Sequence, residues 1–97
     1  MFVRVWEYEV PGGRARAFAA AYAADGAWSE LFRRAEGYLG TELYRDARTC
    51  RFLTIDRWQD ERDWRSFLSA FGAAYESLDA QLAGLAAAER SLFEGSS

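Results

Sequence analysis

The sequence predicts a single α+β domain in which helices cover one face of an antiparallel sheet. The chain has 97 residues, of which 51% are hydrophobic, so it can build one small core but not two. Seven Phe, five Tyr and four Trp against one Pro indicate a folded chain, because so much ring surface gains free energy on burial. The periodic segments follow the order strand, helices, strand, strand, helix, strand, which is the split βαβ pattern.

The N-terminal half is expected to hold one strand and two helices. Residues 2–10 are rich in β-branched and aromatic side chains, and Pro11-Gly12-Gly13 ends this strand with a turn. Residues 14–24 carry apolar side chains at helical spacing. Asp25-Gly26 stops that helix, and a second short helical stripe follows from Trp28 to Ala35.

The C-terminal half is expected to hold two paired strands, a long helix and a last strand. Residues 38–46 and 51–58 read as strands joined by a short polar link. Asp60 is a candidate N-cap for the long helix, which should bend near Gly72 because a straight rod would overhang so small a domain. Residues 91–94 could form the last strand, so the expected domain covers residues 1–94 and residues 95–97 form a flexible tail.

Composition excludes several classes of function. His and Asn are absent and Cys50 is the single Cys, which removes Ser-His-Asp and Cys-His catalysis as well as imidazole or thiolate metal sites. The net charge of -3 provides no positive excess for binding nucleic acid. No apolar run approaches the roughly 20 residues that cross a bilayer, and no signal-peptide pattern is present. We therefore expect a cytoplasmic protein without metal, nucleic-acid or membrane partners.

One polar constellation follows from the expected strand pairing. If Tyr44 pairs with Thr54, Glu42 lies directly opposite Asp56 on the same side of the sheet. The first strand adjoins the third in this topology, so Arg4 could reach both carboxylates. A proton shared between them would give an acid or base that works near neutral pH. The alternative is a structural Arg–carboxylate bridge, which is the more common use of such residues.

Aromatic side chains are expected to gather between the sheet and the helices. If these surfaces meet, they enclose a site that suits a flat aromatic ligand, although an ordinary aromatic core is the alternative for any single ring. The candidate ligand-binding residues are Trp6, Tyr8, Tyr44 and Trp58 on the strands, and Tyr22, Trp28, Phe32, Trp64, Phe67 and Phe71 on the helices. The strands are apolar on both sides, so a second copy that covers the other sheet face is expected to make a symmetric homodimer.

Three segments resemble the antibiotic biosynthesis monooxygenase family. They are the strand end Val10-Pro11-Gly12-Gly13, the segment from Gly37 to Asp46, and the segment from Phe52 to Trp58 that precedes an acidic helix start. The resemblance spans nearly the whole chain and implies a ferredoxin-like protomer in a dimeric α/β barrel. It further implies a pocket between sheet and helices in each protomer.

The resemblance implies two activities among characterised relatives, which are cofactor-free quinone formation from polyketide phenols and heme degradation. Heme-degrading relatives share a first-strand Asn, a Trp on the long helix and a His farther along that helix. Trp6 and Phe67 stand at the first two places here and His is absent, so heme degradation is not expected. Quinone-forming relatives also use an Asn, so their catalytic set does not carry over.

The resulting hypothesis is a cofactor-independent monooxygenase that acts on a small aromatic or polyketide-like substrate. Arg4 would orient an anionic oxygen, Asp56 with Glu42 would handle the proton, and Trp rings would form the walls. The alternative is a non-catalytic ligand-binding or structural dimeric module of the same fold.

Overall fold

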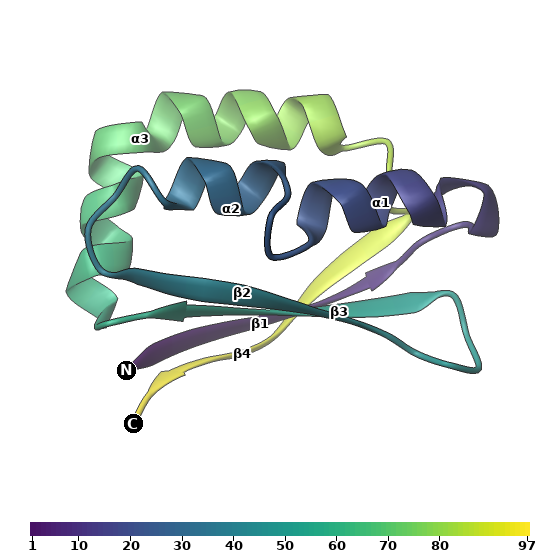
Figure 1. Cartoon of the computed structure of the whole chain (residues 1–97), viewed down its shortest axis with the longest axis horizontal. Coiled ribbons are helices and arrows are strands. Elements are labelled where there is room, and N and C mark those ends of the chain that lie inside the picture. Colours follow the sequence, from purple (N-terminus) through teal and green to yellow (C-terminus); the bar gives the residue numbers. More distant parts are fainter.

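The computed structural model describes residues 1–97 as a four-stranded antiparallel sheet with helices on one face (Figure 1). The strand order is β2-β3-β1-β4, and every neighbouring pair is antiparallel. This topology confirms the predicted α+β class with its split βαβ arrangement. The elements are β1 (Phe2–Glu9), the 3-10 turn η1 (Gly12–Arg14), α1 (Ala15–Tyr22), α2 (Ala27–Phe32), β2 (Tyr38–Arg45), β3 (Arg51–Trp58), α3 (Glu61–Leu82) and β4 (Ala88–Ser96).

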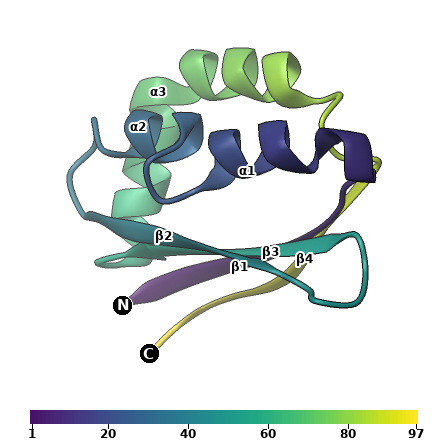
Figure 2. The same cartoon turned by 45° about the vertical axis from the view of Figure 1, so that its right-hand side comes forward.

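Alternation along the central strands decides which side chains face the helices. In β3 the side chains of Phe52, Thr54, Asp56 and Trp58 are buried, whereas the residues between them are only half-buried. Successive side chains of a strand point to opposite faces, so these four line the helix-covered side. Figure 2 shows that the helices lie on this side only and leave the other sheet face without cover.

The β2–β3 hairpin pairs one residue away from the expected register. The Asp46 N–H donates to the Arg51 carbonyl at 2.9 Å, which closes the loop on residues 47–50. As a result Thr41, and not Glu42, lies opposite Asp56. A shift of one residue reverses the direction of every side chain, so Glu42 faces away from the helices. The predicted pairing of Glu42 with Asp56 is therefore wrong.

The last strand is longer than the sequence indicated. β4 begins at Ala88 and ends at Ser96, so Gly95 and Ser96 belong to the strand and not to a tail. Its first residues are weak strand formers, but they pair with the end of β1. Ladder hydrogen bonds therefore override local propensity at this edge.

None of the helices combines the length and the hydropathy of a membrane-spanning segment.

The long helix α3 begins at a cap and bends in its middle. The Asp60 carboxylate accepts a hydrogen bond from the Asp63 N–H at 3.1 Å, which confirms the predicted N-cap. The backbone leaves helical geometry at Phe71, with φ -120° and ψ 20°, so the expected bend near Gly72 is present. After the bend the helix runs across the top of α2 and α1 (Figures 1 and 2).

An aromatic core holds the helices against the sheet. The Phe32 ring centroid lies 5.2 Å from that of Phe67 and 5.6 Å from that of Trp58, and Trp58 is fully buried. Edge-on and tilted contacts of this kind contribute about 0.5–1.5 kcal/mol each beyond area burial. The core therefore fixes α2 and the first half of α3 over β3.

Gly37 is required where the chain leaves α2 and enters β2. Its φ is +86°, and a Cβ at this position would lie 2.3 Å from the Asp63 Cγ. We expect Gly37→Ala to lower the free energy of unfolding by more than the roughly 1–3 kcal/mol of a left-handed non-glycine backbone, because the clash adds to it. Chemical denaturation measures this loss.

Gly12→Ala is the matched control for that substitution. A Cβ at Gly12 has nothing within 4 Å and the residue has no positive φ. Its effect should stay within about 0.5 kcal/mol. Equal losses in the two variants would contradict the assignment of Gly37 as a steric requirement.

Candidate functional site

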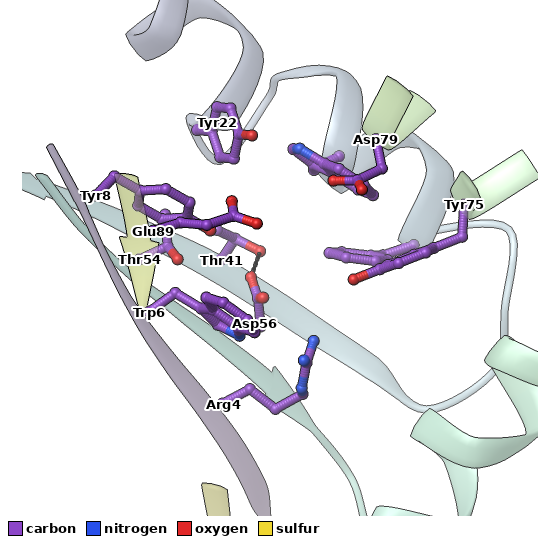
Figure 3. Close-up of a pocket in the computed structure, with 12 residues that line it drawn as sticks. Arg4, Trp6, Tyr8, Tyr22, Thr41, Thr54, Asp56, Tyr75, Asp79 and Glu89 are labelled. Carbon is purple, nitrogen blue, oxygen red and sulfur yellow. Dashed lines mark hydrogen bonds between the residues drawn. The ribbon is translucent and has the colours of Figure 1, made fainter. Parts of the chain in front are cut away.

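A cavity lies between the inner sheet face and the helices (Figure 3). It encloses about 50 Å³, which is room for a few water molecules when roughly 10–15 Å³ holds one. Every strand and every α-helix contributes to its walls. The lining residues are Arg4, Trp6, Tyr8, Tyr22, Trp28, Phe32, Thr41, Thr54, Asp56, Tyr75, Asp79 and Glu89.

The structure brings together part of the predicted site. The predicted residues that line the cavity are Arg4, Trp6, Tyr8, Tyr22, Trp28, Phe32 and Asp56. Those that do not are Glu42 and Tyr44 on the outer sheet face, Trp58, Trp64 and Phe67 in the buried core, and Phe71 at the bend of α3. The shift in register turns Glu42 and Tyr44 away from the cavity. The core residues do not line the cavity because their rings pack tightly against one another.

Glu42 belongs to a surface network and not to the cavity. It accepts hydrogen bonds from the Tyr44 hydroxyl and, at 2.6 Å, from Nη2 of Arg57. These hydrogen bonds, with that from Tyr44 the larger effect, lower the pKa of Glu42. The carboxylate is therefore ionised at neutral pH and shares no proton with Asp56.

Asp56 is the buried carboxyl group of the cavity. Only 8% of the residue is exposed, and the Thr41 Oγ1 lies 2.7 Å from its Oδ1 (Figure 3). Burial raises the pKa of Asp56, and this effect exceeds the opposing effects of the Thr41 hydrogen bond and the Arg4 charge. Asp56 therefore holds a proton more tightly than an ordinary aspartate.

Arg4 stands beside Asp56 with its guanidinium group fixed on two sides. It pairs with Asp56 in the β1–β3 ladder, but its ion pair is with Glu94 of β4, where Nε and Oε2 are 3.1 Å apart. The guanidinium carbon lies 3.9 Å from the centroid of the Trp64 ring and 5.7 Å from that of Trp6. This cation–π contact orients the group without removing all its charge.

Several polar groups of the walls have no protein partner at regular hydrogen-bond geometry. The buried Thr54 Oγ1 and Trp28 Nε1 have no hydrogen bond of regular geometry, although they lie near the hydroxyl groups of Tyr8 and Tyr22. Burial also raises the pKa values of Tyr8, Tyr22 and Tyr75, so their phenol groups are neutral at physiological pH. Buried polar groups without partners are costly, so a ligand that supplies complementary atoms would recover free energy here.

Two carboxylates form the rim of the cavity. Asp79 reaches it from the second half of α3, and Glu89 reaches it from β4. Partial burial, followed by the charge of Asp79, raises the pKa of Glu89. No group of three or more metal-ligating side chains comes together anywhere in the chain. The rim is thus acidic.

The sequence interpretation missed five lining residues for identifiable reasons. They are Thr41, Thr54, Tyr75, Asp79 and Glu89. Alternation with Asp56 already pointed to Thr54, and helical spacing from Trp64 pointed to Tyr75. Thr41 depended on the hairpin register. Asp79 and Glu89 meet through the path of the bent helix, which no local pattern reports.

The fold and this cavity define a class of small ferredoxin-like proteins with a site between the sheet and the helices. A family model described as antibiotic biosynthesis monooxygenase matches residues 1–76. The chain therefore belongs to the antibiotic biosynthesis monooxygenase family. Among curated proteins, none matches the sequence.

Solved structures of other proteins share the fold. The monooxygenase from the gene ActVA-Orf6 of Streptomyces coelicolor, in complex with nanaomycin D, is similar with a TM-score of 0.75 and 19% identity over 99% of this chain and 88% of that one. SnoaB, a cofactor-independent oxygenase from Streptomyces nogalater, gives a TM-score of 0.74 and 18% identity over 99% and 91% of the two chains. At such low identity the likeness shows the fold and not the activity.

The raised pKa of Asp56 predicts a pH-dependent effect on stability. The folded state favours the protonated form of Asp56, so protonation of Asp56 stabilises the fold. This contribution is fully present below the pKa of the unfolded chain, near 3.8, and is lost as the pH rises through the pKa of the folded state. Asp56→Asn removes the titration. We expect the free energy of unfolding of Asp56→Asn, relative to wild type, to increase as the pH rises above 3.8, as measured by denaturation across a pH series.

Glu42→Gln provides the control of opposite sign. The pKa of Glu42 is lowered in the folded state, so its ionised form stabilises the fold above the unfolded pKa. The relative stability of Glu42→Gln should therefore fall as the pH rises. The same trend in both variants would contradict the assigned environment of Asp56.

Proposed function

We propose that the protein is a cofactor-independent monooxygenase that oxidises a small phenolic or polyketide-like aromatic compound in this cavity. The observation that carries the proposal is the position of a buried carboxyl group, Asp56, next to an oriented cation, Arg4, inside a wall of aromatic rings. Membership of the monooxygenase family supports the reaction class. The description of SnoaB as cofactor-independent supports chemistry without a bound redox group.

Each side chain has a defined role in the proposed reaction. Asp56 accepts the phenol proton, and Arg4 stabilises the phenolate that results. The electron-rich phenolate is the reductant for molecular oxygen. One oxygen atom replaces a ring hydrogen and becomes a quinone carbonyl, and the other leaves as water with the two hydrogens that the phenol loses. Phenol and oxygen thus give quinone and water without an external electron donor.

Substrate entry requires the cavity to open beyond its 50 Å³. A second hollow of about 190 Å³ lies beside it, between the end of α3 and the start of β4. The two spaces share Tyr22, Asp79 and Glu89. Asp79 and Glu89 are exposed, so their side chains can rotate away at little cost. A bicyclic ligand would then extend from Asp56 into the second hollow.

Turnover of 1-naphthol under labelled oxygen tests the proposed reaction. We expect 1,4-naphthoquinone to form with one labelled oxygen atom, detected by mass spectrometry, and oxygen uptake to match the quinone produced. Asp56→Asn should lower the turnover number by roughly 100-fold or more, the usual size of a general-base contribution.

Tyr44→Phe is the matched control, since Tyr44 lies on the outer sheet face and its loss should leave turnover unchanged. Full activity in Asp56→Asn would overturn the role of Asp56 as proton acceptor. Saturable binding of naphthol without turnover would favour the non-catalytic ligand-binding module, for which the Arg4–Glu94 ion pair is the supporting observation, because it already engages the guanidinium group.

We also propose a homodimer that closes the uncovered sheet face. The side chains of Val5 and Ile55 are neighbours in the ladder on this face, and Phe93 of β4 flanks them with 56% of its surface exposed. Contiguous apolar surface of this kind is uncommon on monomers. A two-fold contact would bury it on both copies at once.

Light scattering tests the homodimer. The wild-type protein should have twice the protomer mass of 11.0 kDa, and Ile55→Arg should have the mass of one protomer, because an unpaired charge in an apolar interface is costly. Ala80→Arg, on the exposed side of α3, should keep the wild-type mass. A wild-type mass of one protomer at all concentrations would refute the homodimer.

A further inference from the structure

A chain of hydroxyl groups runs from Asp56 away from the cavity to the turn between α1 and α2. The Asp56 Oδ1 is 2.7 Å from the Thr41 Oγ1, which is 2.5 Å from the Tyr38 hydroxyl. That hydroxyl is 3.1 Å from the Ser29 Oγ, and Ser29 donates to the Ala23 carbonyl at 3.2 Å. Two strands, β2 and β3, thus meet helix α2 and the turn after α1 through one continuous line of oxygen atoms.

The number of hydrogens in this chain depends on the protonation of Asp56. The chain has four contacts, whereas Ser29, Tyr38 and Thr41 supply one hydroxyl hydrogen each. The Ala23 carbonyl can only accept. If Asp56 is ionised, Thr41 donates to it, and this hydrogen bond by itself lowers the pKa of Asp56. In the chain, however, Tyr38 then donates to Ser29 and Ser29 to Ala23, so the contact between Thr41 and Tyr38 is left without a hydrogen. If Asp56 is protonated, every contact has one hydrogen and all donors point toward Ala23.

Water in the cavity can reach Thr41 and Asp56, but it cannot reach the inner end of the hydroxyl chain. Ser29 is fully buried, and Thr41 is 8% exposed. Gly26 holds the α1–α2 turn so tightly that a Cβ there would lie 2.4 Å from the Ala21 carbonyl oxygen. The acceptor at the end of the chain is therefore fixed in place. A contact of two oxygen atoms with no hydrogen between them is unfavourable, because their lone pairs face each other at hydrogen-bond distance.

We propose that Ser29, Tyr38 and Thr41 are positioning residues that hold a proton on Asp56. We call the hydroxyl chain from Asp56 through Thr41, Tyr38 and Ser29 to the Ala23 carbonyl the relay. Every contact of the relay holds a hydrogen only when Asp56 is protonated, so the relay increases the proton affinity of Asp56. This inference rests on the proposed function, in which Asp56 is the base. The experiment that tests it measures the protonation of Asp56 directly and needs no substrate.

The other groups around Asp56 do not supply this effect. Arg4 of β1 lowers the pKa of Asp56, while Tyr8 of β1 and Tyr75 of α3 are neutral phenols. Asp79 of α3 and Glu89 of β4 share the cavity at its exposed rim. The relay differs from these groups because it acts on Asp56 through a series of hydrogen bonds that ends at the Ala23 carbonyl.

The decisive variant is Ser29→Ala, which touches no atom of Asp56. Without the Ser29 oxygen, Tyr38 can donate its hydrogen to Thr41 without giving up another hydrogen bond. Ionised Asp56 then accepts from Thr41, and every remaining contact still holds one hydrogen. We expect the pKa of Asp56, followed by carboxyl carbon NMR across a pH series, to fall by roughly half a unit to one unit. One net hydrogen bond is about 0.5–1.5 kcal/mol and one pKa unit is about 1.4 kcal/mol.

Tyr38→Phe breaks the same relay at its centre and should lower the pKa of Asp56 by a similar amount. The double variant should equal either single variant, because one interruption already frees the relay. Tyr44→Phe makes the same change in the same strand on the opposite face and should leave the pKa unchanged. Asp56→Asn identifies the signal, and thermal unfolding checks that each variant is folded.

An unchanged pKa of Asp56 in Ser29→Ala and Tyr38→Phe would overturn the relay. Additive shifts in the double variant would also overturn it, because they would indicate independent local effects. Neither result bears on turnover of naphthol, so the relay and the proposed oxygenase activity can fail separately. If both hold, the acid limb of the pH–activity profile should move to lower pH in Ser29→Ala.

Discussion

The pairing of Thr41 with Asp56 across the β2–β3 ladder is the constraint on which the chemistry of the site depends. It follows from a loop that closes on residues 47–50 through the hydrogen bond between Asp46 and Arg51. A strand alternates its faces, so this loop determines that a hydroxyl group, and not a second carboxylate, meets Asp56. One residue more in the loop would place Glu42 there and create a like-charge pair in a buried setting.

The bend of α3 separates the aromatic residues of this helix into two groups, one in the core and one at the cavity. Before the bend, Trp64 and Phe67 pack into the core with Trp58 and leave no space. After the bend, the helix crosses over α2 and brings Tyr75 to the cavity wall. Trp64 joins both regions, because one of its contacts is the core and another is the guanidinium group of Arg4.

The fold was accessible from the sequence, whereas the site was accessible only in part. Periodicity and turn residues located the elements, and Asp60 and Gly72 marked the start and the bend of α3. Alternation also placed Arg4 and Asp56 side by side, because β1 and β3 are regular. The partner of Asp56 could not be deduced, because register changes with one loop residue and no propensity scale resolves that difference. The rim was equally hidden, since Asp79 and Glu89 come together only through the tertiary path of α3 and β4.

The hydroxyl chain that ends on the Ala23 carbonyl also has a mechanical meaning. Its last acceptor belongs to the turn between two helices that cover the cavity. In the proposed relay, a change that moved this turn away from Ser29 would lengthen the contact of 3.2 Å and alter the balance of hydrogens along the chain. By thermodynamic reciprocity, proton transfer to Asp56 must in turn change the free energy of the displacement. The proposed relay thus links the position of these helices to the proton affinity of Asp56.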